Sequence, residues 1–222
     1  MEGERLINGV TFGTTYCEDL GLYLASKELG NPKPKTSFVE VPGSSVTLDF
    51  TEAFGSVNYS NRMIQLVLLC LEPWDDQFDL QSEVRSLLHG QKMNIYFDED
   101  DGMYYRGRIA VNSWSFYQGA GRVQISINAE PFLYKPCSLT SPALSSTAQD
   151  VVINNKGLKP VVPTLDLTGA TTVAFGSTSV EVTSGTGKTV TGLVFDPGEN
   201  TVSLASTGTT NTVTFHWTEA YL

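Results

Sequence analysis

Residues 87–111 read LLHGQKMNIYFDEDDGMYYRGRIAV, and this stretch contains the end of a helix, two strands and the turn between them. Gly90 stands where a glycine commonly ends a helix, because glycine adopts a left-handed conformation at little cost. The runs that end at Phe97 and begin at Met103 have the residue types and alternation of strands. Asp101-Gly102 between them is a strong hairpin signal. The stretch therefore predicts a helix followed by an antiparallel strand pair.

The helix itself is predicted from the residues just before this stretch. Asp75 and Asp76 follow Trp74 and can satisfy the free N–H groups of a first helical turn. Apolar residues then recur at the spacing of one helical face, at Phe78, Leu80, Val84, Leu87 and Leu88. A single amphipathic helix must lie against a β core, since the rest of the chain shows only strand patterns.

The chain divides into two β-rich parts. Short strand patterns with turns between them fill residues 37–131, and residues 135–150, KPCSLTSPALSSTAQD, then lose the alternation and become rich in Pro, Ser, Thr and Ala. Strand patterns resume beyond them, separated by Gly, Asn and Asp-Pro-Gly turns. We predict a mainly β protein: an N-terminal antiparallel β-sandwich with one helix and a protruding β-hairpin (1–134), a linker (135–150) and a small galectin-like or jelly-roll sandwich (151–222).

Composition excludes several classes of function. The 222 residues are 41% hydrophobic and 17% charged, as in a folded globular protein, and the net charge is −10. Such an acidic chain is not expected to bind nucleic acid or an anionic membrane, and no apolar run reaches the ~18 residues of a membrane span. Three scattered cysteines fit neither a disulfide scaffold nor a zinc site, so we expect reduced thiols.

The acidic run FDEDDG was compared with an EF-hand calcium loop, which has carboxylates at its first and twelfth positions and glycine at its sixth. Placing Gly102 at the sixth position puts Phe97 first and Arg108 twelfth, so two anionic ligands are missing. A looser calcium site stays open as an alternative. The favoured interpretation is a turn whose acids lie on a solvated tip and face Arg106 and Arg108.

No other motif predicts an enzyme. Gly187-Lys188-Thr189 is similar to the end of a P-loop, but the required earlier glycine is replaced by Val182, so we predict a hairpin turn. His89 and His216 have no metal-ligand spacing. We therefore expect no catalytic residue, no metal site and no cofactor. A second class of function remains: a cell-surface or carbohydrate-binding module, in which Trp217 and Tyr221 could stack on sugars.

Several spaced motifs together resemble one known family. They are Glu18-Asp19-Leu20-Gly21-Leu22, the segment 32–68, PKPKTSFVEVPGSSVTLDFTEAFGSVNYSNRMIQLVL, and the stretch 87–111 with its leucine-histidine-glycine, acidic hairpin and tyrosine-x-glycine-arginine. In this order they resemble the distal tail protein (Dit) family of long, non-contractile-tailed bacteriophages, over residues 11–132. Several motifs in register are more specific than any one of them.

The resemblance implies a virion structural protein at the distal tail tip, assembled in the host cytoplasm. It implies a homo-hexameric ring that joins the major tail tube protein to the tail-associated or tail fibre protein and lets DNA through its channel, with receptor-binding proteins docked on the C-terminal domain. The short second domain makes an elaborate carbohydrate-binding module doubtful. An acidic channel wall would keep DNA phosphates off.

As a hypothesis, the hairpin at residues 96–108 forms a subunit interface or borders the channel. The residues assigned to it are Tyr96, Asp98, Glu99, Asp100, Asp101, Tyr104, Tyr105, Arg106 and Arg108.

Overall fold

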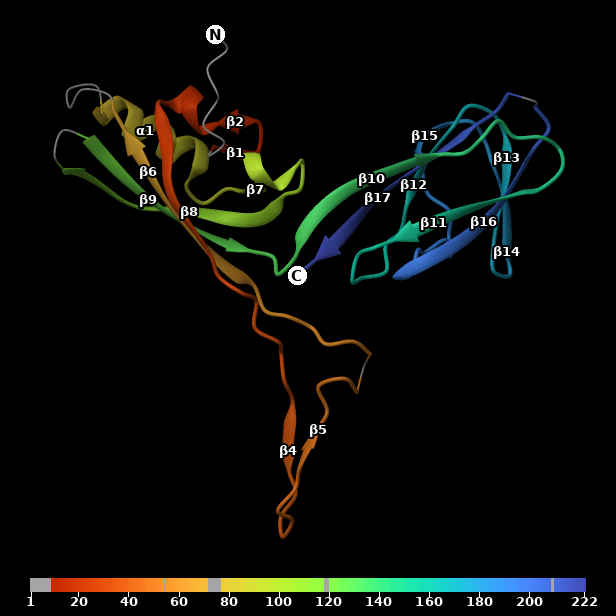
Figure 1. Ribbon diagram of the computed structural model, residues 1–222, viewed down its shortest axis with the longest axis horizontal. Helices are drawn as coiled ribbons and strands as arrows, with labels where there is room; N and C mark the ends of the chain where they lie inside the picture. Colours follow the sequence, from red (N-terminus) through yellow and green to blue (C-terminus); the bar gives the residue numbers. More distant parts are fainter. Residues whose placement is uncertain (1–8, 54, 72–76, 118–119, 209) are drawn as a thin grey trace. The chain divides into compact units, whose positions relative to one another are not determined.

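The computed structural model describes residues 9–53, 55–71, 77–117, 120–208 and 210–222. The chain divides into two compact units, Met1–Leu133 together with Leu222, and Tyr134–Tyr221. Strands dominate both units, and one α-helix is present among the described residues (Figure 1). No described helix has the length and apolar character needed to cross a membrane. The expectation of a mainly β, antiparallel architecture is confirmed.

The first unit is built on one seven-stranded sheet. Its hydrogen-bonded order is β2-β1-β7-β8-β9-β6-β3. The strands are β1 (Val10–Phe12), β2 (Thr15–Tyr16), β3 (Leu22–Leu29), β6 (Arg62–Cys70), β7 (Lys92–Phe97), β8 (Tyr105–Tyr117) and β9 (Ala120–Ala129). The sheet is strongly curled: Lys27 of edge strand β3 forms an ion pair with Glu99 at the end of β7, although three strands lie between β3 and β7. The curled sheet therefore encloses its own core.

Strict alternation along the central strands separates a buried face from an exposed one. In β6, Ile64, Leu66 and Leu68 are buried while the residues between them point outward. The register sets Ile64 opposite Ile127 of β9, which in turn lies opposite Ile109 of β8. These side chains form one hydrophobic core with residues of β1, β3 and β7. Because the side-chain period of a strand is two, burying this set exposes the alternate set on all three strands.

Helix α1 (Gln77–Leu88) adds Val84 and Leu88 to that core, and Gly90 follows it with φ +79°, as predicted for the glycine that ends the helix. The predicted apolar face is only partly correct, because Phe78 is 75% exposed and Leu87 is 41% exposed. Only a narrow side of the helix, which includes Val84 and Leu88, faces the core. Trp74, Asp75 and Asp76, which were predicted to begin the helix, lie outside the described residues.

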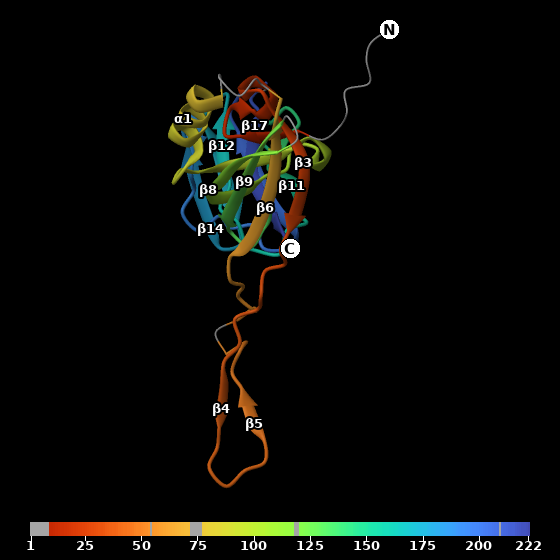
Figure 2. The same ribbon diagram turned by 90° about the vertical axis from the view of Figure 1, so that its left-hand side faces the viewer.

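Between β3 and β6 the chain forms a long hairpin that extends away from the sheet (Figures 1 and 2). We call residues 34–59 the arm. At its base Pro34 bridges to Tyr59, and farther out β4 (Phe38–Glu40) pairs with β5 (Thr47–Asp49). No described residue of the arm joins either hydrophobic core. The sequence had predicted ordinary strands here, and the protruding hairpin is the arm and not residues 96–108.

The second unit is a sandwich of two four-stranded sheets, ordered β10-β17-β12-β15 and β11-β16-β13-β14. Apolar residues from both sheets, such as Leu165, Val173 and Phe215, form a second core. The strands are β10 (Leu133–Thr140), β11 (Gln149–Asn155), β12 (Thr164–Leu167), β13 (Thr171–Phe175), β14 (Thr178–Val182), β15 (Gly185–Lys188), β16 (Gly198–Ser206) and β17 (Val213–Tyr221).

Two sequence predictions for this unit are wrong. Residues 135–150 were expected to be a linker, but they contain most of β10, and Leu144 is buried in the second core. Pro136 is tolerated in β10 because β10 is the outermost strand of its sheet, where a missing N–H costs little. Gly187-Lys188 was expected to be a turn, but both residues belong to β15, which pairs with β12 at Leu165↔Lys188.

Substitutions at two adjacent leucines test which side of α1 faces the core. Replacing the buried Leu88 by alanine should lower the free energy of unfolding by about 2–5 kcal/mol, because the substitution leaves a cavity in the core. The same substitution at Leu87, which is largely exposed, should cost less than about 1 kcal/mol. Urea unfolding followed by circular dichroism measures both. Equal losses would contradict the rotation.

Candidate functional site

Residues 96–108 form a hairpin that is closely tied to its own unit. Strand β7 pairs with β8 at Ile95↔Tyr105 and Lys92↔Arg108, and a short 3₁₀ turn, η3 (Asp98–Asp100), begins the connection. Asp101 and Gly102 both have positive φ, at 45° and 76°. The predicted Asp-Gly turn is therefore present, and aspartate is one of the few residues other than glycine that tolerate this conformation.

The acids at the start of the turn contact neighbouring segments and do not project into solvent alone. Asp98 accepts hydrogen bonds from the Gly9 amide (3.0 Å) and from the Tyr16 hydroxyl (2.8 Å). Burial, together with this bond to Asp98, raises the pKa of Tyr16 to about 12. Glu99 pairs with Lys27, whose ammonium also lies 4.2 Å from the centre of the Phe97 ring. These acids hold the edges of the curled sheet together.

Asp100 differs from its neighbours because it is half-buried. Its Oδ2 atom is buried and has no hydrogen-bond partner among the described residues. Loss of hydration raises the pKa of this carboxyl; the nearby Lys27 opposes the change and Glu99 adds to it. Because folding raises this pKa, the folded chain binds the proton more tightly than the unfolded chain does, and Asp100 opposes folding at neutral pH.

Tyr105 is the member of the predicted interface that belongs to the core. It is 4% exposed, its ring meets Phe97 edge-on at 6.1 Å, and the Arg62 guanidinium lies 5.3 Å from its ring centre. Burial raises the pKa of its hydroxyl, and the positive charge of Arg62 counteracts part of that change. Tyr105 therefore stabilises the unit and cannot contact a partner directly.

The remaining four predicted residues lie together. Tyr96, Arg106 and Arg108 alternate with buried neighbours and point outward, and the Tyr104 ring lies 5.4 Å from that of Tyr96. They belong to a continuous surface that we call the outer sheet face. Its other members are Met63, Gln65, Val67 and Leu69 of β6, Ala110 of β8, Arg122, Gln124, Ser126 and Asn128 of β9, and Tyr23 of β3.

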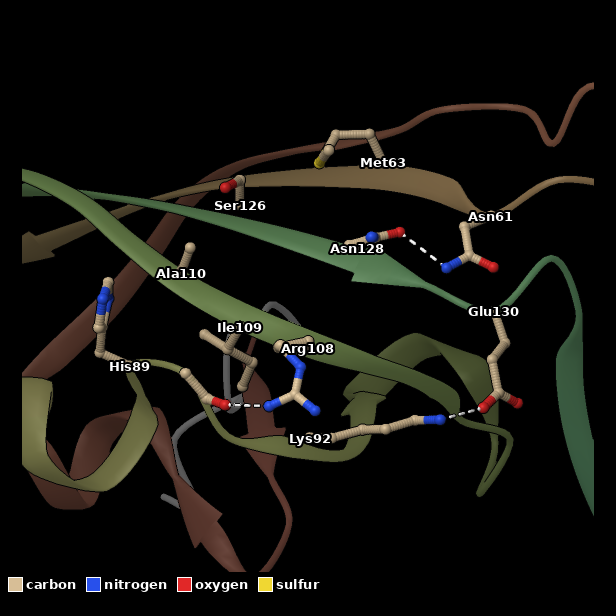
Figure 3. A pocket seen from close by; sticks show the side chains of 11 residues that line it. Asn61, Met63, His89, Lys92, Arg108, Ile109, Ala110, Ser126, Asn128 and Glu130 are labelled. Atoms are coloured by element: carbon tan, nitrogen blue, oxygen red, sulfur yellow. Dashed lines mark hydrogen bonds and ion pairs between the residues drawn. The ribbon is translucent and has the colours of Figure 1, made fainter.

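A hollow of about 530 Å³ opens at one end of the outer sheet face (Figure 3). Met63 and Asn128 lie on one side of it, and Lys92, Arg108 and Glu130 on the other. Lys92 pairs with Glu130 at 2.6 Å, whereas Arg108 donates to the Gly90 carbonyl oxygen at 2.5 Å. The hollow is open to solvent and lined by many polar side chains, so it suits contact with another protein segment better than enclosure of a small molecule.

Gly107, between the two arginines, explains the tyrosine-x-glycine-arginine motif. Strand β9 passes so close that a β-carbon on Gly107 would lie 2.8 Å from Ala129 Cα and 2.6 Å from the Ile127 Cγ2 methyl. Only glycine fits there without moving backbone. The tight packing fixes the position of the flanking arginines on the outer sheet face.

The arm has two chemically different faces. Since Val39 lies opposite Leu48, these two residues share one face with Val41, Val46 and Phe50. All five are exposed, by 40% to 66%. Phe38, Glu40, Thr47 and Asp49 share the other face. A row of exposed aliphatic and aromatic residues of this length marks an interaction surface. Sequence analysis missed it because alternation looks the same in a strand that covers a core of its own chain.

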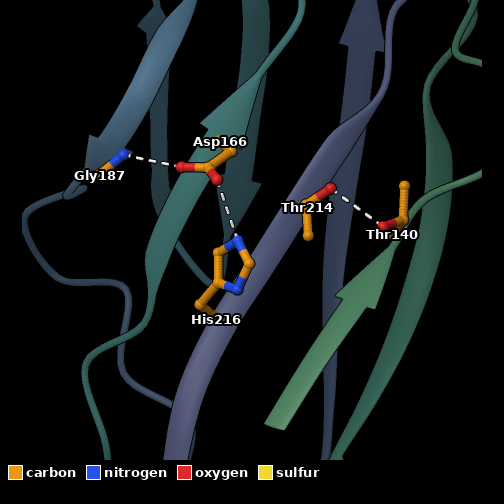
Figure 4. Close-up of polar contacts among 5 residues, drawn as sticks. All are labelled: Thr140, Asp166, Gly187, Thr214 and His216. Atoms are coloured by element: carbon orange, nitrogen blue, oxygen red, sulfur yellow. Dashed lines mark hydrogen bonds and ion pairs between the residues drawn. The ribbon is translucent and has the colours of Figure 1, made fainter. Parts of the chain in front are cut away.

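The second unit has a polar outer surface on the sheet of β12 and β17 (Figure 4). His216 Nε2 lies 3.1 Å from one carboxylate oxygen of Asp166, and the Gly187 amide donates to the other oxygen at 2.8 Å. The amide hydrogen bond and the histidine lower the pKa of Asp166. The hydroxyls of Thr140 and Thr214 are 2.9 Å apart.

The aromatic residues considered for sugar stacking do not form a platform on that surface. Trp217 packs edge-on against Phe195 at 6.0 Å, and its indole N–H lies 3.3 Å from Glu219 Oε1. The Tyr221 hydroxyl donates to the same nearly buried carboxylate. Both aromatic side chains make these contacts within the second unit. Among the described residues, no group of three His, Cys, Asp or Glu side chains is placed to hold a metal ion.

The position of Asp100 leads to a pH-dependent stability. Asp100→Asn should raise the free energy of unfolding at pH 7, because it removes a charge that folding desolvates. The gain should shrink as pH falls below the raised pKa of Asp100 and vanish near the ordinary aspartate value of ~3.9. Urea titrations at several pH values measure it, with the exposed Asp150→Asn as control. A gain that is independent of pH would contradict the assignment.

Comparison with known proteins finds likeness in structure alone. No protein-family model and no curated protein sequence matches the chain. The Dit protein (gp 19.1) of phage SPP1, described as a paradigm of the hub adsorption apparatus in phages that infect Gram-positive bacteria, superposes with a TM-score of 0.65 at 14% identity, over 97% of this chain and 100% of that one. A chain of the phage p2 baseplate, in its activated conformation with Sr, gives 0.49 at 8% identity over 96% and 98%. The chain therefore has the fold of SPP1 Dit along nearly its whole length.

Proposed function

We propose that this chain is a structural protein of a phage tail tip and acts as a hub of the Dit type. One observation carries the proposal: the match to the fold of SPP1 Dit spans 97% of this chain and the full length of that protein. A shared fold alone does not define a function, but the surfaces of this chain agree with the role. Its activity would be assembly and connection, with no catalytic turnover.

The proposed assembly is a homo-hexameric ring with a central channel for DNA. A cyclic ring joins one surface of each copy to a different surface of the next, so each copy needs two complementary patches. The arm and the outer sheet face are two exposed surfaces of different character on the first unit. The net charge of −10 favours a channel that does not retain DNA phosphates.

The two ends of such a ring would have different partners. The tail tube protein would bind one end, and the tail-associated or tail fibre protein would bind the other. The second unit would dock further baseplate or receptor-binding proteins, and its polar surface around Asp166 and His216 is suited to a wet protein interface. Among the predicted interface residues of the first unit, Arg106 and Arg108 are exposed, as are Asp98, Glu99 and Asp101, and Tyr96 and Tyr104 are partly exposed.

Electron microscopy tests the ring directly. The purified full-length chain, stained and imaged over a range of concentrations, should form sixfold rings with a central opening, and mass photometry should report six times the 24.2 kDa chain mass. Particles that stay monomeric at high protein concentration would contradict the hexamer. Rings with another copy number would keep the hub role and correct the symmetry.

A further inference from the structure

We propose that His89 makes the contact between α1 and β8 sensitive to pH: the unprotonated ring holds the end of the helix to the sheet, and protonation releases it. The inference goes beyond the assembly role, because it concerns a contact within a single copy of the chain. It rests on the hydrogen bonds where α1 leads into β7, on the proton that those bonds place, and on the charges nearby.

The segment between α1 and β7 continues the pairing of β7 with β8. Just before β7, the Ile109 amide donates to the Gln91 carbonyl oxygen at 2.9 Å, and the Gly90 amide donates to the Ile109 carbonyl oxygen at 2.8 Å. In an antiparallel ladder every second residue directs its N–H and C=O groups to the same side. The next donor of β8 toward this side is therefore the Val111 amide.

The acceptor for this donor is a side chain. The chain coming from α1 turns at Gly90, which has φ +79°, and His89 Nδ1 accepts a hydrogen bond from the Val111 amide at 3.1 Å. The ring thus adds one bond to the ladder beyond its last backbone pair. Leu88, one residue earlier, is buried in the core. In the leucine-histidine-glycine motif, leucine packs, histidine accepts and glycine forms the turn.

This bond fixes which ring nitrogen carries the proton. A backbone N–H can only donate, so Nδ1 of His89 must be unprotonated and the neutral ring holds its proton on Nε2. An imidazolium carries protons on both nitrogens and cannot accept the bond. Proton binding and the bond to Val111 therefore exclude each other. The bond is present at high pH and is lost as the pH falls through the range of about 8 to 5, in which histidine side chains gain a proton.

The charged groups around His89 are mostly cationic. It lines the hollow together with Lys92 of β7, Arg108 of β8 and Glu130 beyond β9 (Figure 3). Arg85 lies one turn earlier on α1, and its carbonyl oxygen accepts the His89 amide at 3.0 Å. The residues of β6 and β9 that line the hollow are uncharged. Glu130 is already paired with Lys92, so protonation would add a further positive charge to the hollow.

Release of the bond would act on the end of the helix and on the hollow together. Val111 is 6% exposed, so an amide that loses its acceptor there is poorly placed to bind water instead. The end of α1 and the adjoining residues of β8 would loosen, while the packed strands β6 and β9 would keep the sheet. One wall of the hollow would thus become less fixed and more positive as the pH falls.

Hydrogen exchange of single amides, followed by NMR on the full-length unassembled chain, tests the contact. Protection of the Val111 amide, corrected for intrinsic exchange, should fall about threefold to tenfold between about pH 7.5 and about pH 5.5, the change expected for one hydrogen bond. Amides of β6 and β9 should change less than about twofold. Unchanged protection of Val111 would overturn the proposal.

Three variants separate the proton from the contact. In His89→Asn the amide oxygen takes nearly the position of Nδ1 and does not titrate, so protection of Val111 should stay high at both pH values. His89→Leu has no acceptor, so protection should be low at both. His216→Asn removes the other of the two histidines and should behave as the unchanged chain. A pH dependence that persists in His89→Asn would overturn the proposal.

A measurement without any substitution completes the test. At about pH 7.5 the nitrogen chemical shifts of the His89 ring should show the proton on Nε2, and a proton on Nδ1 would contradict the assigned bond. Because single copies are measured, these results are independent of whether the chain forms a ring, so this inference and the proposed function can fail separately.

Discussion

Alternation along β6, β8 and β9 is the constraint on which the rest of the first unit depends. The buried row of Ile64, Ile109 and Ile127 fixes the register of three neighbouring strands. A shift of the strand register by one residue would expose these isoleucines to solvent. The observed register is therefore strongly favoured over its neighbours. The same constraint places Met63, Arg108 and Asn128 outward as one row. The core therefore defines the surface that we assign to assembly.

The acidic run at residues 98–101 has a structural role that its composition conceals. Asp98 and Glu99 connect the end of β7 to both edges of the curled sheet, Asp98 through Tyr16 of β2 and Glu99 through Lys27 of β3. Asp101 occupies a left-handed turn position. The Asp100 carboxyl, in contrast, is partly desolvated, which raises its pKa. The four consecutive acids thus have separate local contacts and conformations.

Local signals in the sequence were sufficient for the parts of the fold that depend on neighbouring residues. The Asp101-Gly102 turn, the glycine after the helix and the antiparallel strands follow from φ preferences and side-chain period. The arm, the rotation of α1 and strand β10 could not be derived in this way, because each depends on which surface covers a strand or helix. Of the predicted interface, Tyr96, Tyr104, Arg106 and Arg108 gather on one face, while Tyr105 enters the core because strand parity places it there.

The arm has an exposed apolar face and contributes no described residue to either hydrophobic core, so the proposed assembly would have to cover it. Hydrogen exchange of its backbone amides reports this most directly, since amides of an uncovered hairpin exchange far faster than those of a packed one. In the dilute, unassembled full-length chain, the amides of β4 and β5 should exchange quickly while those of β6 and β9 stay protected. In the assembled state the arm amides should become strongly protected. Equal exchange of the arm in the two states would contradict a part for the arm in the proposed assembly.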